Sequence, residues 1–340
     1  MTNTQTSLNE AVKLTLREHG IDTSELLLIS GNGVSHTHYK IGSSSWILRV
    51  PRLSQMNLSP IDQLLLQEAA FKRAEASGMT PKFLATIPIS ELLPLGALIV
   101  ERIDGIPPPG RTALPSLSRC LAAIHSQPLP ALNKRAPIQS PKNPLAVIAH
   151  QAKDTLSAYM PQTNIGQKAR DEINSRLNTV LKMAEENVDL LPEALCVSDT
   201  HPGTFIMRSP KDACFVDLEK PVYGCPALDL AHTVIQVASG WDPDAAMSPN
   251  KQDRDAFTQA WLERVPEKMA EANAPRIKPF RQAVWLRTIG FFMRWKKESA
   301  LSGAWSIERL GPGAAEHFQK HVDNSLQDEA IMNASEAWSD

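Results

Sequence analysis

Three acidic residues stand beside short apolar runs in one segment of the chain, CVSDTHPGTFIMRSPKDACFVDLEKP, from Cys196 to Pro221. They are Asp199, Asp217 and Glu219. A carboxylate next to a strand-forming run is costly to remove from water unless it is paired, binds a metal ion or takes part in a reaction. This segment is therefore where we expect chemistry.

A cation that could assist this chemistry is Arg49, which lies in the apolar run WILRV. Glu68 is the obvious carboxylate on the helix expected after that strand. An ion pair between the two would extend the guanidinium toward a nucleotide and would lower the cost of burying either charge. The alternative is that Arg49 reaches solvent at a strand end and that Glu68 faces water.

A glycine-rich stretch, SGNGVSHTHYKI, separates the first two expected strands and contains Gly31, Gly33 and Ser35. Backbone N–H groups in such a loop can bind phosphate oxygens. Gly-rich hairpin turns are also common without any ligand. Taken alone, the loop is more often a plain turn than a phosphate site.

The first hundred residues combine helical and strand patterns. Helical spacing is expected over 8–19 and over 60–77, and strands over 25–30, 37–41, 45–50, 83–88 and 97–103. Short turns between the strands predict a small antiparallel sheet. The second helix is expected to bury Ile61, Leu64, Leu65, Ala69 and Phe71.

Residues 104–110, DGIPPPG, break all periodicity, and we place a hinge there. Beyond them, short strands are expected only over 194–198, 205–207 and 214–217, and helices over 114–126, 143–158, 166–187, 226–238, 253–264 and 279–299. The chain thus divides into an N-terminal lobe (1–103, a helix, a five-stranded antiparallel sheet and an inserted helix), a linker (104–110) and a helical C-terminal lobe (111–340). This α+β arrangement is typical of the protein-kinase-like two-lobe fold, which implies that the first lobe binds a nucleotide and that the second carries the catalytic loop and the acceptor pocket.

The acidic segment resembles the catalytic core of the aminoglycoside phosphotransferase and choline kinase family. VSDTHPGT stands where the family has H-x-D-x-x-x-x-N, VDLE where it has I-D-F-E or I-D-W-E, and YGCPALDLA where it has Y-G-D-P-x-x-D-L-A. The similarity runs from about Leu26 to Ala238 and is strongest over 199–232.

The resemblance implies a role for each matching residue. Asp199 would orient the acceptor hydroxyl and take its proton, and Asp217 would hold Mg²⁺ against the nucleotide phosphates. Asp229 would brace the catalytic loop. The implied nucleotide contacts are the pair of Arg49 with Glu68 and, at the hinge, the backbone of Glu101, Arg102 and Ile103.

Three residues depart from the family pattern. Val197 replaces a His, Thr204 replaces the metal-binding Asn, and Cys225 replaces an Asp. A Thr hydroxyl is a hard oxygen that can bind Mg²⁺, but it is shorter than Asn and would hold a second metal position more loosely.

The acceptor pocket is expected in the larger lobe. His201 is predicted to shape the loop or line the pocket, with Glu219, Trp241 and Asp242 as further lining residues. Aromatic rings beside an acid would suit an amine through cation–π contact. A second aromatic group, Trp285, Ile289, Phe292 and Trp295, has helical spacing and is expected to be a buried stripe.

Composition limits the other possibilities. The chain has 340 residues, 42% apolar and 21% charged, with a net charge of −2 spread along it, which argues against nucleic acid or an anionic membrane as partner. Its four cysteines form no C-x-x-C pair, so neither a zinc site nor a disulfide framework is expected, and a reducing cytoplasm suits them. Neither a signal peptide nor a membrane span is expected.

The sequence therefore predicts a cytoplasmic, ATP- and Mg²⁺-dependent kinase, a monomer or homodimer. It would phosphorylate a hydroxyl of a small polar metabolite such as an amino alcohol, a sugar or an aminoglycoside-like compound. The alternative is a weakened or inactive nucleotide-binding or regulatory protein of the same fold.

Overall fold

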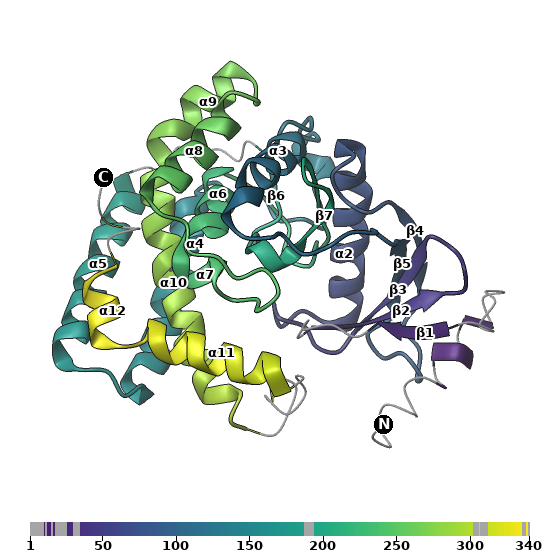
Figure 1. Cartoon of the computed structure of the whole chain (residues 1–340), viewed down its shortest axis with the longest axis horizontal. Helices are drawn as coiled ribbons and strands as arrows, with labels where there is room; N and C mark the ends of the chain where they lie inside the picture. The colour runs from purple at the N-terminus through teal and green to yellow at the C-terminus, as the bar shows by residue number, and fades with distance from the viewer. Residues whose placement is uncertain are drawn as a thin grey trace.

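The computed structural model describes residues 10, 12–14, 16–17, 26–29, 35–186, 194–301, 306, 312–334 and 338. A twisted sheet lies at one side of the molecule and most of the helices lie at the other, with helix α2 beside the sheet on the side of the helical part (Figure 1). This is the α+β, kinase-like arrangement predicted from the sequence.

The sheet has five antiparallel strands in the order β1-β2-β3-β5-β4. Because side chains alternate across a strand, Tyr39 and Leu48 pack on one face with Val12 and Leu16, whereas Arg49 points to the opposite face, toward α2. The strands are β1 (Leu26–Ile29), β2 (His36–Ile41), β3 (Trp46–Pro51), β4 (Phe83–Ile87) and β5 (Ala97–Glu101).

Helix α2 (Pro60–Ala74) begins where the sequence predicts, because Ser59 caps it by accepting a hydrogen bond from the N–H of Asp62. The predicted buried face was partly wrong. Leu64 and Phe71 are buried, but Ile61 and Leu65 are 52% and 47% exposed. The buried stripe is Gln63, Leu64, Leu66, Gln67, Ala70, Phe71 and Ala74. The helix is therefore rotated by about one residue from the predicted orientation.

The remainder of the chain is mostly helical and is organised around α10 (Ile277–Glu298), which contacts α4, α5 and α6. Its stripe of Trp285, Ile289, Phe292 and Trp295 is buried, as predicted. The other helices are α3 (Leu114–His125), α4 (Pro144–Tyr159), α5 (Gln167–Glu186), α6 (Ala227–Val234), α7 (Gln236–Ser239), α8 (Lys251–Leu262), α9 (Glu267–Asn273), α11 (Pro312–Ser325) and α12 (Asp328–Met332).

Two short strand pairs carry the acidic segment. They are β6 (Ala194–Cys196) with β9 (Val222–Gly224), and β7 (Phe205–Ser209) with β8 (Asp212–Phe215). The loop between β6 and β7 holds Asp199, and the loop between β8 and β9 holds Asp217 and Glu219. Each loop therefore connects the β6–β9 pair to the β7–β8 pair.

Several elements differ from the expected ones. The helix expected over 226–238 is two helices, because Ile235 has an extended backbone with ψ 135°. Strand β9 and helices α9, α11 and α12 were not predicted. In the described part of the chain, no helix is both long and apolar enough to cross a membrane.

Candidate active site

The loop after β6 is fixed by Asp229, a fully buried residue on α6. The Asp229 carboxylate accepts hydrogen bonds from the backbone N–H groups of Val197 at 2.8 Å and Ser198 at 2.9 Å. Ser198 has a left-handed backbone, φ 64°, which costs on the order of 1 kcal/mol for a residue with a side chain. The hydrogen bonds that Asp229 accepts offset this cost and set the direction in which the next residue, Asp199, projects.

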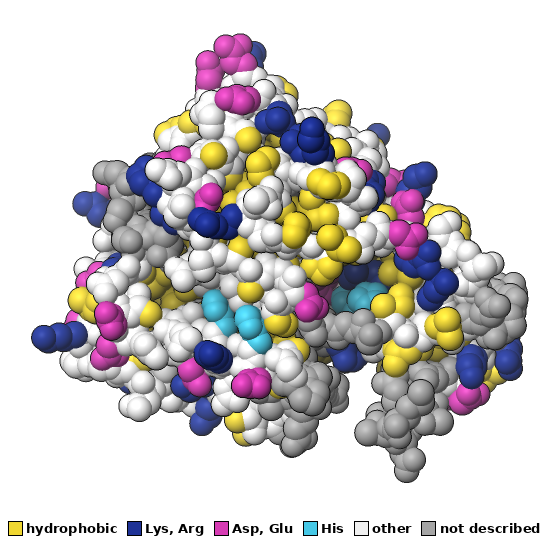
Figure 2. All heavy atoms as spheres, in the orientation of Figure 1, with side chains coloured by type: hydrophobic (Ala, Val, Ile, Leu, Met, Phe, Trp, Pro, Cys, Tyr) yellow, Lys and Arg dark blue, Asp and Glu magenta, His cyan; other side chains and the backbone are white. Residues whose placement is uncertain are grey.

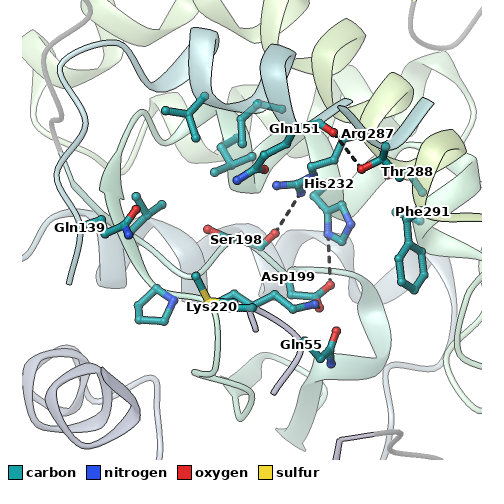
Figure 3. Close-up of a pocket in the computed structure, with 18 of the residues that line it drawn as sticks. Gln55, Gln139, Gln151, Ser198, Asp199, Lys220, His232, Arg287, Thr288 and Phe291 are labelled. Carbon is teal, nitrogen blue, oxygen red and sulfur yellow. Dashed lines mark hydrogen bonds and ion pairs between the residues drawn. The ribbon is translucent and has the colours of Figure 1, made fainter. Parts of the chain in front are cut away.

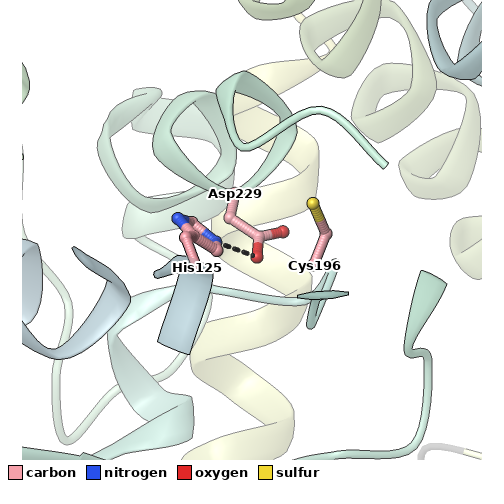
Figure 4. A group of neighbouring side chains, drawn as sticks. All are labelled: His125, Cys196 and Asp229. Atoms are coloured by element: carbon pink, nitrogen blue, oxygen red, sulfur yellow. Dashed lines mark hydrogen bonds and ion pairs between the residues drawn. The ribbon is translucent and has the colours of Figure 1, made fainter. Parts of the chain in front are cut away.

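Asp229 is itself held by His125 (Figure 4). The indole N–H of Trp261 donates to His125 Nδ1 at 3.0 Å, so Nε2 carries the proton and donates to Asp229 at 3.0 Å. Cys196 lies close enough for the three side chains to form a possible metal cluster. Both nitrogens of His125 are already used, however, and the group is better explained as the buried support of the loop.

Asp199 forms a close ion pair with Lys220, whose Nζ lies 2.5 Å from Oδ2. Its other oxygen, Oδ1, lies 3.8 Å from Nδ1 of His232. Burial opposes ionisation of Asp199, but the positive charge of the neighbouring Lys220 outweighs it and holds the pKa of Asp199 well below its usual range. Asp199 is therefore ionised at neutral pH.

Arg49 forms its hydrogen bonds with the loop between β8 and β9 rather than with Glu68 on helix α2. Its guanidinium donates to the Val216 carbonyl at 2.9 Å and to Asp217 Oδ1 at 3.0 Å, and it lies 5.4 Å from the centre of the Phe71 ring. The predicted ion pair between Arg49 and Glu68, both described residues, is not formed. Arg49 is 5% exposed, so the prediction that it would be buried is correct and only the partner was wrong.

Glu68 instead binds Lys72 at 2.6 Å and Thr86 at 2.5 Å. The rotation of α2 explains this difference. Gln67, not Glu68, lies on the buried stripe, and its side-chain oxygen is 3.3 Å from Nε2 of His36 on β2. The helix therefore presents a neutral amide to the sheet, and Arg49 takes its carboxylate from Asp217.

Glu219 lies beside the sheet, and it is not among the residues that line the cavity beside Asp199. It accepts hydrogen bonds from Ser35 at 3.2 Å and from Gln55, and it lies 3.6 Å from Nδ1 of His36. Burial and the neighbouring Asp217 carboxylate raise the pKa of Glu219 to about 8. The site thus resists a second negative charge unless a cation compensates it.

A cation fits this place. His36, Asp217 and Glu219 each offer a ligand atom, and these atoms lie within 4.8 Å of one another. Carboxylate oxygens are the ligands that Mg²⁺ prefers, and an imidazole nitrogen adds affinity for ions such as Mn²⁺. Burial and the charge of Arg49 lower the pKa of His36, so its ring is neutral and able to act as a ligand.

Other predicted nucleotide and metal residues remain predictions. The Thr204 hydroxyl already bonds to the carbonyls of Asp199 at 2.9 Å and His201 at 2.7 Å, which shapes the loop. The N–H groups of Glu101 and Arg102 donate to Lys82 and Ser45, so these donors are used within the chain. Nothing in the described residues tests the predicted contact between the backbone of Ile103 and the nucleotide. Gly31 and Gly33 lie outside the described residues.

A cavity of about 630 Å³ opens beside Asp199 (Figure 3). Lys220, His201 and His232 surround the aspartate, and α10 forms a wall with Arg287, Thr288, Phe291, Phe292 and Arg294. Figure 2 shows a notch between the sheet side and the helical side of the molecule, with histidine, acidic and basic side chains gathered in it.

The two predicted pocket residues after α7 behave differently. Trp241 lines the cavity and stacks on Phe318, with ring centres 4.4 Å apart. Asp242 does not line it. Asp242 packs against Gly203, where a Cβ atom would collide with its side chain, and it accepts a hydrogen bond from the N–H of Asp244. The acid predicted to recognise the acceptor therefore packs against the loop that carries Asp199.

Several residues of the site were not predicted. Lys220 directly follows the V-D-L-E motif, so its position in the sequence could have drawn attention to it. His36 alternates with His38 on β2, and His38 pairs with Arg49 across the sheet. Nothing local marks His232 or Arg287, because they come from helices that reach the cavity only in the folded chain.

Comparisons with known proteins agree with this geometry. The profile of the phosphotransferase enzyme family matches residues 27–272, more than half of the chain. A search of curated protein sequences found no significant match.

Solved structures give the same fold. Spectinomycin phosphotransferase APH(9)-Ia, in complex with ADP and spectinomycin, is 12% identical, with a TM-score of 0.62 over 96% of this chain and 98% of that one. Choline kinase LicA from Streptococcus pneumoniae is 12% identical, with a TM-score of 0.57 over 93% and 99%. An ethanolamine kinase from Plasmodium vivax is 14% identical, with a TM-score of 0.58 over 93% and 88%. At these identities the likeness concerns the fold.

Proposed function

The chain belongs to the phosphotransferase enzyme family, and from that premise we propose that it transfers the γ-phosphoryl group of ATP to a hydroxyl of a small molecule. The observation that carries the proposal is the ion pair between Lys220 and Asp199. Lys220 follows Glu219, which lies with Asp217 and His36. This contact joins the segment that carries Asp217 and Glu219 to the loop that carries Asp199, which supports the proposal that the two aspartates act on the same bound molecules.

In the proposed reaction the hydroxyl oxygen of the acceptor attacks the γ-phosphorus. The bond between that phosphorus and the β–γ bridging oxygen breaks, ADP leaves, and the hydroxyl proton passes to Asp199. Because Lys220 occupies Oδ2, Oδ1 is the oxygen that would accept this proton. The low pKa of Asp199 makes it a weak base, so its main contribution is to position the hydroxyl, as is usual when the transition state is loose.

The phosphate side of the proposed site is formed by Asp217, Glu219 and His36. These three residues would hold the divalent ion, and Thr204 is the predicted additional ligand. A bound Mg²⁺ neutralises charge on the transferred phosphoryl group. Arg49 keeps Asp217 in place through the contact with Oδ1, which leaves Oδ2 for the metal. The ADP bound to the spectinomycin phosphotransferase supports ATP as the donor.

The test is Asp199→Asn, assayed for ADP formation with a panel of small hydroxyl compounds. Turnover should fall by about a hundred to ten thousandfold, because a positioned proton acceptor contributes that much. Nucleotide affinity should stay nearly unchanged. Asp212→Asn is the matched control, since Asp212 lies at the start of β8, does not line the cavity and pairs with Arg208. A fully active Asp199→Asn variant would show that the role is wrongly assigned.

A second candidate function is a nucleotide-binding protein with weakened or no catalysis. Two observations favour it: Thr204 replaces the expected metal ligand, and Lys220 already occupies one oxygen of Asp199. Thermal unfolding with ATP, with and without Mg²⁺, separates the two functions. Stabilisation that requires the metal supports catalysis, and stabilisation without metal dependence, or none, supports the second candidate.

A further inference from the structure

The acceptor cavity carries more positive than negative charge around its catalytic residue. Lys220 and Arg287 flank Asp199, and Lys220 alone already neutralises the aspartate at 2.5 Å. His232 adds no charge, because burial lowers its pKa to about 3. One cation, Arg287, is therefore left over beside the reacting group.

Arg287 is held in position without a carboxylate partner. In the described part of the chain, its hydrogen bond is to the Ser198 carbonyl, at 3.3 Å, and it forms no ion pair. A guanidinium has five N–H donors, so this bond fixes the group next to the catalytic loop and leaves most donors for a ligand. Burial lowers the pKa of Arg287, against the more distant charges of Asp199 and Asp229, as expected for a cation that lacks a close counter-charge.

The other charged residues of the cavity do not supply that counter-charge. Arg294 already pairs with Glu298 at 3.0 Å. Asp62 lies at the exposed first turn of α2, where it accepts a hydrogen bond from the Ser59 hydroxyl. The rest of the wall near Arg287 is uncharged: Gln151 and Thr288 are polar, and Phe291 and Trp241 are aromatic.

We propose that the acceptor carries an oxyanion, a carboxylate or a phosphate, which Arg287 binds while Asp199 orients the hydroxyl of the same molecule. A planar guanidinium matches the two oxygens of such a group, and the hydrogen bonds are charge-assisted. This inference rests on the proposed function and deepens it. It replaces the expected amine, since an ammonium would meet Lys220 and Arg287, and the cavity's other acid, Asp62, lies at the exposed first turn of α2.

The test uses four compounds on one three-carbon skeleton that differ in charge: glycerate, glycerol 3-phosphate, glycerol and 3-amino-1,2-propanediol. Each is titrated against the full chain, with binding followed by thermal unfolding and transfer by ADP formation. Glycerate, glycerol 3-phosphate or both should stabilise the protein more than the neutral and cationic members. The two anionic arms show whether the recognised group is a carboxylate or a phosphate.

Two variants assign the effect to Arg287. Arg287→Gln should weaken binding of the preferred anion by about ten to a hundredfold, the usual contribution of a hydrogen bond to a charged group. Arg287→Lys, which keeps the charge but not the planar fork, should recover part of it. Lys296→Gln is the control, because Lys296 lies on the same helix, pairs with Asp323 and does not line the cavity.

Preference for the aminodiol, equal behaviour of all four compounds, or no response to any of them would overturn the inference. So would an Arg287→Gln variant that binds the anion as well as the parent chain does. Titration of ATP with Mg²⁺ is run in parallel. If the nucleotide does not bind, the proposed function fails. If the nucleotide binds and only the anion preference is missing, this inference alone fails.

Discussion

The surroundings of Asp217 and Glu219 differ from those of Asp199 in the sign of the charge that is not neutralised within the protein. On the side of Asp217 and Glu219, where the phosphates are proposed to bind, Arg49 pairs with Asp217, and Glu219 is a second carboxylate beside the pair. On the side of the cavity, where the acceptor is proposed to bind, Lys220 pairs with Asp199, and Arg287 is a second cation that bonds to the Ser198 carbonyl. In each case the extra group has its pKa displaced toward the neutral form, upward for Glu219 and downward for Arg287.

This difference indicates which ligand each side can receive. A buried group that cannot keep its charge within the protein is stabilised by a ligand of the opposite charge. The phosphate side therefore fits a divalent cation, and the acceptor side fits an anion. Lys220 lies at the boundary, because it pairs with Asp199 and also acts electrostatically on Glu219. Experiments that change one side and measure both can test the contrast.

The largest effect is expected from Asp217→Asn. The Asn oxygen can still accept the hydrogen bond from Arg49, but the charge that attracts the metal is lost. Stabilisation by ATP with Mg²⁺, about 2.7 kcal/mol at a hundred times Kd, should largely disappear, while anion binding on the acceptor side should persist. Thermal unfolding with each ligand in turn measures both. If the variant loses stabilisation by the anion as well as by ATP with Mg²⁺, the two sides do not bind their ligands independently.

A smaller effect is expected from Lys220→Gln. The ammonium keeps the pKa of Asp199 low, so the parent chain should show no acidic limb from this residue in its pH–activity profile near neutrality. Without Lys220, the pKa of Asp199 should rise and an acidic limb should move toward neutral pH. The profile of kcat/KM against pH is the measurement. Lys211→Gln, in the exposed turn between β7 and β8, is the control. Identical profiles would show that Lys220 does not set this ionisation.

The smallest effect concerns His232, whose pKa is lowered by burial to about 3 from an ordinary value of 6.5. Between these values the unfolded chain binds a proton that the folded chain does not, so stability decreases as pH falls. One such group contributes about 1.4 kcal/mol per pH unit to the free energy of unfolding. Urea unfolding at a series of pH values should show a shallower slope for His232→Gln.

Other buried histidines, His36 and His38, keep part of the slope in that variant, since their pKa values are also lowered by burial. His150→Gln, at an exposed position, should leave the slope as it is. An unchanged slope in His232→Gln would mean that this ring is charged in the folded chain. His232 would then add a positive charge to those of Lys220 and Arg287 on the acceptor side.

The acidic segment, the strands around it and the kinase-like fold could be predicted because their signals are local. Motif spacing placed Asp199, Asp217 and Asp229, and apolar runs placed β2, β3, β5 and most of the long helices. Short strand pairs such as β6 with β9 were harder, because β9 has only three residues and forms through pairing with a distant strand.

What the sequence by itself determined is therefore the acidic motif that suggests the site and the order of most of the elements, because both follow from neighbours along the chain. The tertiary structure alone decided which residues meet. A rotation of α2 by about one residue turned Glu68 away from Arg49, and the packing of α10 on α4 and α6 brought Arg287 to the catalytic loop. Helical periodicity gives only an approximate facing direction, and contacts between residues far apart in the chain depend on how whole elements pack.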